Sequence, residues 1–170
     1  MAKPDLYRLK MKGQKTPQWE LVKTKHKPPG RSEHAGVVYR GKYYITCGNF
    51  GAVGPGNDTW CLNLSNFKWA SLRNNGNGPV IKRHCHNMWA ANNKLYVLGG
   101  RVAVRGSSGE LSNCSSPSIE EFVSYDLETK TWSTVDIIGD DRPHDLSEYT
   151  VLPLYKEELD DDPSTIIVWG

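Results

Sequence analysis

Long apolar runs are absent from this sequence. No stretch reaches the roughly 18 consecutive apolar residues that suggest a membrane-spanning helix, and Met1 to Asp5 leads into polar sequence without the apolar centre of a secretion signal. These absences predict a protein without membrane contact. We expect it in the cytoplasm, with the nucleus as the alternative.

An excess of charge of one sign is also missing. The 21 basic and 19 acidic side chains leave a formal net charge of +2. No strong field therefore attracts the chain to polyanions, and a nucleic-acid partner is not expected. With 38% hydrophobic and 24% charged residues, the composition is that of an ordinary soluble globular domain.

Paired cysteine motifs are lacking as well. The four cysteines, Cys47, Cys61, Cys85 and Cys114, are widely separated, and no two of them form a Cys-x-x-Cys pair. In a reducing compartment we expect free thiols, three of them buried in strands as small apolar residues.

The sequence shows no recognisable catalytic arrangement. No Ser-His-Asp order or pair of catalytic carboxylates stands at a known spacing. His84-Cys85-His86 is the one local group that resembles metal ligation. On a strand, His84 and His86 would share a face and Cys85 would point away, so at most two of them could reach one ion. We expect His86 to be a structural residue hydrogen-bonded to backbone, and we expect no cofactor, no metal ion and no enzymatic activity.

The sequence does contain an internal repeat. Five residues of one segment reappear 52 positions later. They are Arg31, His34, Lys42, Tyr44 and Gly48, which return as Arg83, His86, Lys94, Tyr96 and Gly100. Further along, Leu64 and Trp69 match Leu127 and Trp132 at a spacing of 63, which places an 11-residue insertion in the second copy, after Arg101.

Each copy has the pattern of a four-stranded meander. In the first copy Arg40-Gly41 is a hairpin turn between two apolar segments. In the second copy Leu95 to Leu98 is a short buried strand, and Gly99-Gly100 ends it. A polar turn at residues 128–130 then separates two further strands.

A period near 50 residues with a double glycine and a later tryptophan is a known repeat signature. The Arg-x-x-His, Gly-Gly, Tyr-Asp-Leu and Trp elements together resemble the kelch repeat, with Cys47 replacing the first glycine in the first copy. The resemblance implies an all-β fold of kelch-type β-propeller blades, each a four-stranded antiparallel sheet. A closed ring would need roughly twice this length at that period, so we expect an incomplete ring.

The domain organisation follows from the repeats. Residues 1–18 form a basic N-terminal arm without a convincing period, and residues 19–170 form the kelch-repeat domain. Its repeats cover about 29–72, 79–135 and a truncated 143–170. Trp19 to Val22 matches the last strand of a blade. The serine-rich insertion of residues 102–121 is expected to be a mobile surface loop, either a tolerated insertion or a binding or phosphorylation loop.

The resemblance implies a protein-interaction scaffold or adaptor that binds a partner protein through loops at one end of its blades. Exposed arginines often anchor such interfaces, and the candidates are Arg31, Arg83, Arg101 and Arg105. For Arg31 and Arg83 the alternative is a structural role, with the guanidinium tied to neighbouring backbone.

Two other functions remain open at the level of sequence. One is a metal-dependent enzyme on a kelch propeller, and the other is a truncated isoform or partial gene product without independent function. An incomplete ring also exposes unpaired strand edges, which predicts self-association through the open edges of the blades.

Overall fold

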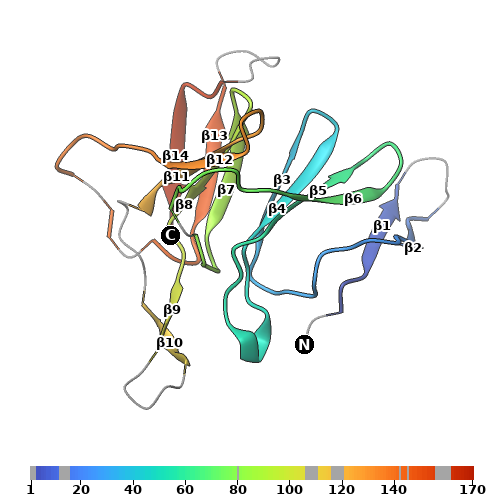
Figure 1. Cartoon of the computed structure of the whole chain (residues 1–170). Coiled ribbons are helices and arrows are strands. Elements are labelled where there is room, and N and C mark those ends of the chain that lie inside the picture. Colours follow the sequence, from blue (N-terminus) through green and yellow to red (C-terminus); the bar gives the residue numbers. More distant parts are fainter. Residues whose placement is uncertain are drawn as a thin grey trace.

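The described residues fold into short β-strands, arranged as two four-stranded and three two-stranded sheets (Figure 1). The computed structural model describes residues 3–11, 16–79, 81–105, 111–115, 121–141, 143–144, 146–155 and 162–170, and over 103–105 and 111–115 the backbone alone. The 3-10 turn η1 (Gly51–Val53) is a single short turn, and no helix in the described ranges is long and apolar enough to span a bilayer. The predicted all-β class is confirmed.

The first blade is an antiparallel sheet in which every strand pairs with the next one along the chain. Its strands are β3 (Ala35–Tyr39), β4 (Lys42–Thr46), β5 (Thr59–Asn63) and β6 (Lys68–Leu72). The predicted turn at Arg40-Gly41 has φ values of 46° and 71°, as a tight two-residue hairpin requires. This turn sets the register that pairs Tyr39 with Lys42.

The second blade repeats this arrangement. Its strands are β7 (Asn87–Ala91), β8 (Lys94–Leu98), β11 (Val123–Asp126) and β12 (Thr131–Thr134). Trp132 pairs with Tyr125 here as Trp69 pairs with Leu62 in the first blade, so the two tryptophans hold equivalent positions, as predicted. The four-stranded antiparallel blades inferred from the repeat are therefore confirmed.

Three hairpins accompany the blades. They are β1 (Leu6–Lys10) with β2 (Gln18–Val22), β9 (Val102–Arg105) with β10 (Leu111–Ser115), and β13 (Thr150–Leu154) with β14 (Thr165–Trp169). The third hairpin begins the next blade, because its register pairs Thr150 with Trp169 as β7 and β8 pair Asn87 with Leu98.

The first two hairpins correct the sequence interpretation. Strand β1 lies inside the arm that was predicted to lack regular structure. Burial alternates only weakly along this strand, because Leu6 and Arg8 are no more than half-buried and the other three residues are exposed. An ion pair of 2.9 Å between Arg8 and Glu20 helps to hold the strand on β2. The backbone of the serine-rich insertion likewise forms strands β9 and β10 instead of an irregular loop, and residues 106–110 and 116–120 lie outside the described ranges.

Apolar side chains fill the spaces between consecutive sheets. One cluster between the two blades contains Tyr39, Tyr44, Leu95 and Tyr125, with Leu95 at 0% exposure. A second cluster, around Trp89, Leu98, Leu146 and Tyr149, joins the second blade to β13 and β14. The strands β3, β7 and β13 pack side by side at the start of their sheets. The core therefore lies between blades, as expected when each sheet covers its neighbour.

One face of the last hairpin is not covered in this way. Val151, Ile166 and Val168 pack on the second blade, whereas Leu152 and Ile167 point outward and are about half exposed. Exposed apolar sheet faces favour association. The expected self-association through open blade edges stays a prediction.

Candidate functional site

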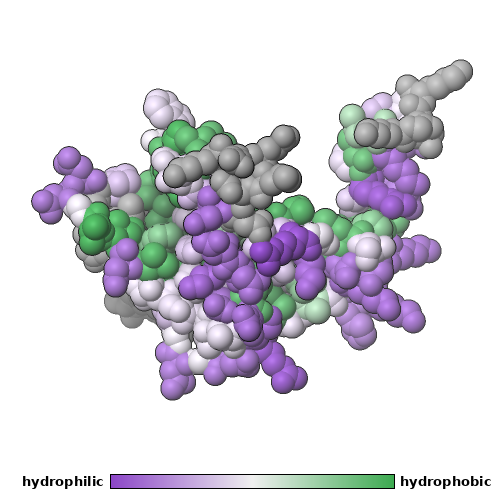
Figure 2. All heavy atoms as spheres, turned by 90° about the horizontal axis from the view of Figure 1, so that it is seen from above, coloured by the Kyte–Doolittle hydropathy of each residue, from purple (hydrophilic) through white to green (hydrophobic). Residues whose placement is uncertain are grey.

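The two ends of the blades differ in the length of their connections. At one end the strands are joined by the short turns 40–41, 64–67, 92–93 and 127–130. Because adjacent strands are antiparallel, the longer connections 47–58 and 99–122 emerge at the opposite end, where β9, β10 and η1 extend away from the sheets (Figure 1). We call this the loop end. Figure 2 looks from above onto the short-turn end and shows hydrophilic side chains over much of it.

Arg31 lies near the loop end but is buried, with 8% exposure. Its Nη1 donates to the carbonyl of Cys47 at 2.8 Å, and its two terminal nitrogens each donate to one carboxylate oxygen of Asp58 at 2.7 Å. Its guanidinium also stands 4.7 Å from the ring centre of Phe50. The guanidinium therefore fastens the ends of β4 and β5 to the turn before β3.

Arg83 does the same in the second blade and is 1% exposed. Its Nη1 donates to the carbonyls of Gly99 and Glu121, both at 2.9 Å, and its Nη2 donates to the Glu121 carboxylate, also at 2.9 Å. From the sequence, Arg31 and Arg83 could be either exposed interface anchors or structural residues, and both guanidiniums are in fact buried and donate to backbone carbonyls. The structure supports the structural alternative for both residues.

The other two candidate arginines belong to the long connection of the second blade. The side chain of Arg101 is 38% exposed and lies 3.6 Å from the carboxylate of Glu148. The backbone of Arg105 ends β9, and its side chain lies outside the described part. Partner binding by Arg101 and Arg105 stays a prediction.

The turn that precedes the first strand of each blade has the same unusual backbone. Glu33, Cys85 and Glu148 occupy the equivalent position and have φ values of 56°, 55° and 59°. Non-glycine residues rarely adopt this left-handed conformation, and such strain gathers at functional sites. The amide of Cys85 donates to the carbonyl of Glu33 at 2.9 Å, and the amide of Glu148 donates to that of Cys85 at 3.3 Å. The three turns thus lie in a row across three sheets.

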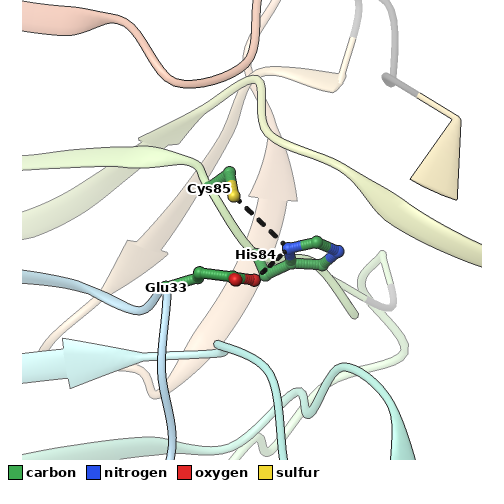
Figure 3. Close-up of side chains that lie close together, drawn as sticks. All are labelled: Glu33, His84 and Cys85. Atoms are coloured by element: carbon green, nitrogen blue, oxygen red, sulfur yellow. Dashed lines mark hydrogen bonds and ion pairs between the residues drawn. The ribbon is translucent and has the colours of Figure 1, made fainter. Parts of the chain in front are cut away.

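Side chains from these turns meet in one cluster (Figure 3). The Nδ1 atom of His84 lies 2.7 Å from Oε2 of Glu33 and 3.4 Å from Sγ of Cys85. On the other side, the Cys85 thiol donates to Oε1 of Glu148 at 3.8 Å. We call Glu33, His84, Cys85 and Glu148 the inner-turn cluster.

The inner-turn cluster corrects the expectation for His84-Cys85-His86. Strand β7 begins only at Asn87, and the φ of Cys85 lies in the left-handed region, so the alternation of a strand does not apply to these residues. His84 and Cys85 therefore point toward one another, while His86 is directed into the protein. Sequence reasoning also missed Glu33 and Glu148. Their equivalence to Cys85 in the repeat was the signal that could have found them.

The Cys85 thiol is protonated at neutral pH. Partial burial, followed by the negative charges of Glu33 and Glu148, raises the pKa of Cys85 to about 11. Only the thiolate is a good nucleophile. The cluster in this form is therefore a hydrogen-bonded, electronegative site rather than an activated cysteine.

His86 is fully enclosed behind this cluster. Burial, then the charge of Arg83 and the nearby His34 and His84, lower the pKa of His86 to about 3. The ring is therefore neutral at physiological pH. An interaction with the backbone of Thr46 acts weakly in the opposite direction on this pKa, although neither ring nitrogen makes a hydrogen bond of good geometry within the described ranges, so the expected bond from His86 to backbone stays a prediction.

The cysteines are less buried than expected. Cys47 has 0% exposure and lies just after β4, whereas Cys61 and Cys85 are half-buried, and the side chain of Cys114 lies outside the described part. Cys47 replaces a glycine of the repeat and keeps a φ of 55°, close to the 61° of Gly99. Its thiol donates to the carbonyl of Ile81 at 2.8 Å, a contact that glycine cannot make.

Comparison with known proteins identifies relatives over most of the chain. The family model of the KLHDC2/KLHL20/DRC7 Kelch-repeats domain matches residues 2–154. Host cell factor 2 of Homo sapiens is 29% identical over 141 residues, which are 77% of this chain and 17% of that protein. Kelch-like protein 25 of Xenopus tropicalis is 28% identical over 115 residues, which are 67% of this chain and 18% of that protein.

The chain therefore spans less than a fifth of the length of these relatives. Among solved structures, that of YjhT matches with a TM-score of 0.60 and 18% sequence identity. The match covers 87% of this chain and 48% of that chain. At this level of identity the likeness shows the fold alone.

Proposed function

Starting from the premise that this chain belongs to the kelch-repeat family, we propose that it is a protein-interaction module whose loop end binds a partner protein. One observation carries the proposal: the long connections 47–58 and 99–122 of the two four-stranded blades both emerge at this end, whereas the strands of these two blades are joined at the other end by turns of two or four residues. Loops held on a rigid scaffold are a common location for recognition residues.

The electrostatics of the loop end suit recognition of a polar protein surface. Glu33 and Glu148 are exposed there, and Arg101 is 38% exposed. These charges stand on backbone that is fixed by the hydrogen bonds across the inner turns. Charged groups held in place at a rim contribute mainly to specificity and to the rate of association.

Charge reversal tests which end binds. The loop-end variant carries Arg101→Glu and Arg105→Glu, and the matched control carries Lys42→Glu and Lys68→Glu, two exposed lysines beside short turns. Both double variants change the net charge by the same amount. Proteins captured from cell extract by the immobilised wild-type chain and by the two variants are compared by quantitative mass spectrometry.

We expect the loop-end variant to capture at least about tenfold less of the partners that the wild-type chain and the control retain. Loss of a charged residue from an interface costs about 1–3 kcal/mol or more of binding free energy. Circular dichroism spectra of all three proteins establish that the fold is intact. Equal loss in both variants, or unchanged capture by the loop-end variant, would contradict binding at this end.

A further inference from the structure

We propose that the inner-turn cluster is a zinc site, in which Cys85, His84 and Glu33 are ligands and Glu148 is the fourth. The three primary donor atoms, a thiol sulfur, an imidazole nitrogen and a carboxylate oxygen, lie within 4.8 Å of one another. They are the three ligand types that zinc uses in proteins. The soft thiol excludes magnesium and calcium, which require oxygen ligands.

The distances between the donor atoms fit tetrahedral coordination. With the usual zinc bond lengths, a nitrogen and a sulfur ligand lie about 3.6 Å apart, and a nitrogen and an oxygen ligand about 3.4 Å apart. In the structure, His84 Nδ1 and Cys85 Sγ are 3.4 Å apart, and His84 Nδ1 and Glu33 Oε2 are 2.7 Å apart. The distance between His84 and Glu33 is thus about 0.7 Å too short for zinc, and the Glu33 side chain, which is 43% exposed, can move outward to correct it.

The fourth ligand comes from the third sheet. Oε1 of Glu148 lies 3.8 Å from Cys85 Sγ, and its side chain is 63% exposed, so the carboxylate can turn toward the other donors. Arg101, which lies 3.6 Å from this carboxylate, then becomes an outer contact of the site. Zinc bound in this way would join the inner turns of three consecutive sheets.

The backbone already holds the ligands in position. Two hydrogen bonds between His84 and Arg101, of 2.9 and 2.7 Å, fix the main chain of the histidine. The amide of Cys85 is fixed on the carbonyl of Glu33, and both residues keep a strained left-handed φ. Ligands held in advance lose little conformational freedom on binding. The side chain of His84 is 6% exposed, whereas the two carboxylates face solvent and provide the entry path.

Binding follows a simple proton balance. Zinc replaces the proton of the Cys85 thiol, and one proton leaves to solvent. The imidazole of His84 binds through Nδ1 in its neutral form, with its own proton on Nε2. No redox step is involved.

The test is titration of the full, untagged chain with zinc chloride by calorimetry. We expect one zinc ion per chain. Cys85→Ser and His84→Ser each remove a ligand and should weaken zinc binding by at least about 100-fold. Loss of a residue that merely hydrogen-bonds to a ligand already weakens metal binding by about 10–100-fold. Glu33→Gln and Glu148→Gln should weaken it by about tenfold or more. The matched controls are Cys61→Ser, at a half-buried thiol, and His144→Ser, at an exposed imidazole, and both should leave the affinity unchanged.

A second readout separates ligation from a general effect on the fold. Cobalt(II) bound to the wild-type chain should show a thiolate-to-metal charge-transfer band in the near ultraviolet, and this band should be absent from Cys85→Ser and present in Cys61→Ser. Urea unfolding of the metal-free variants shows whether each is folded. Absence of stoichiometric zinc from the folded wild-type chain, or the same affinity in Cys85→Ser, would overturn the proposal.

Discussion

Replacement of Arg83 by lysine tests how firmly the buried guanidinium holds the second blade. Arg83 donates to the carbonyls of Gly99 and Glu121, which lie at the two ends of the long connection between β8 and β11. Lysine keeps the positive charge, but its ammonium group cannot reproduce the planar fork. At least one charge-assisted hydrogen bond to a carbonyl is then lost.

The expected cost combines two opposing effects. Loss of one hydrogen bond from a charged group costs about 1.5–3 kcal/mol. The ion pair with Glu121 adds little, because that carboxylate is 48% exposed. In the other direction, Nε of Arg83 is buried and has no hydrogen-bond partner among the described residues, and a methylene group of lysine removes this unfavourable donor. We therefore expect Arg83→Lys to lower the free energy of unfolding by about 1–2 kcal/mol.

Equilibrium unfolding in urea, followed by tryptophan fluorescence, measures this change. At a urea dependence of about 2 kcal/mol per molar, the midpoint should fall by about 0.5–1 M. Arg73→Lys is the matched control, because Arg73 is exposed, and its midpoint should not change. If Arg83→Lys left the midpoint within experimental error of the wild-type value, the structural role assigned to the guanidinium would be wrong.

Two further predictions concern a glycine and the enclosed histidine. Gly99→Ala should lower the free energy of unfolding by about 2 kcal/mol or more in urea, because Gly99 has a φ of 61° and a Cβ there would lie 2.4 Å from the carbonyl oxygen of Leu146. Gly41→Ala, at a φ of 71° with open space around it, should cost only about 1 kcal/mol, and equal losses would refute the steric part of the argument. For His86, the folded pKa of about 3 lies below the unfolded value of 6.5, so unfolding takes up a proton between these values and stability is lost as the pH falls. Between pH 6 and pH 4, the free energy of unfolding of the wild-type chain should fall by up to about 1.4 kcal/mol per pH unit more than that of His86→Phe. Parallel pH profiles of the two urea midpoints would show that this histidine does not titrate as described.

Most of the blade architecture was accessible from the sequence because the repeat fixes relative positions. Trp69 and Trp132 lie 63 residues apart and are equivalent in the two sheets, and the φ values of Arg40 and Gly41 match the tight turn inferred between two apolar segments. Strand β1 was missed because the repeat offers no second copy of it. Its own alternation is hidden by basic side chains such as Arg8 and Lys10.

The inner-turn cluster was not predicted, for a different physical reason. The strand rule assumes extended backbone, and the left-handed φ of Cys85 turns its thiol toward His84 rather than away from it. Glu33 and Glu148 are distant from Cys85 in sequence and reach it only because neighbouring blades place equivalent turns side by side. The burial of Arg31 and Arg83 was left open in the sequence, since an arginine before a strand can face either solvent or backbone carbonyls.

The row of hydrogen bonds that joins Glu33, Cys85 and Glu148 uses only peptide groups, which every residue type except proline can provide. These contacts between successive blades therefore do not depend on which side chains stand at the rim. Each blade presents one position whose chemistry can be exchanged separately, provided that the new residue accepts a φ near 55°, as glycine, asparagine and aspartate do most readily. Charged, thiol or amide side chains could therefore be introduced at these rim positions by substitution, one blade at a time, while the scaffold beneath them stays the same.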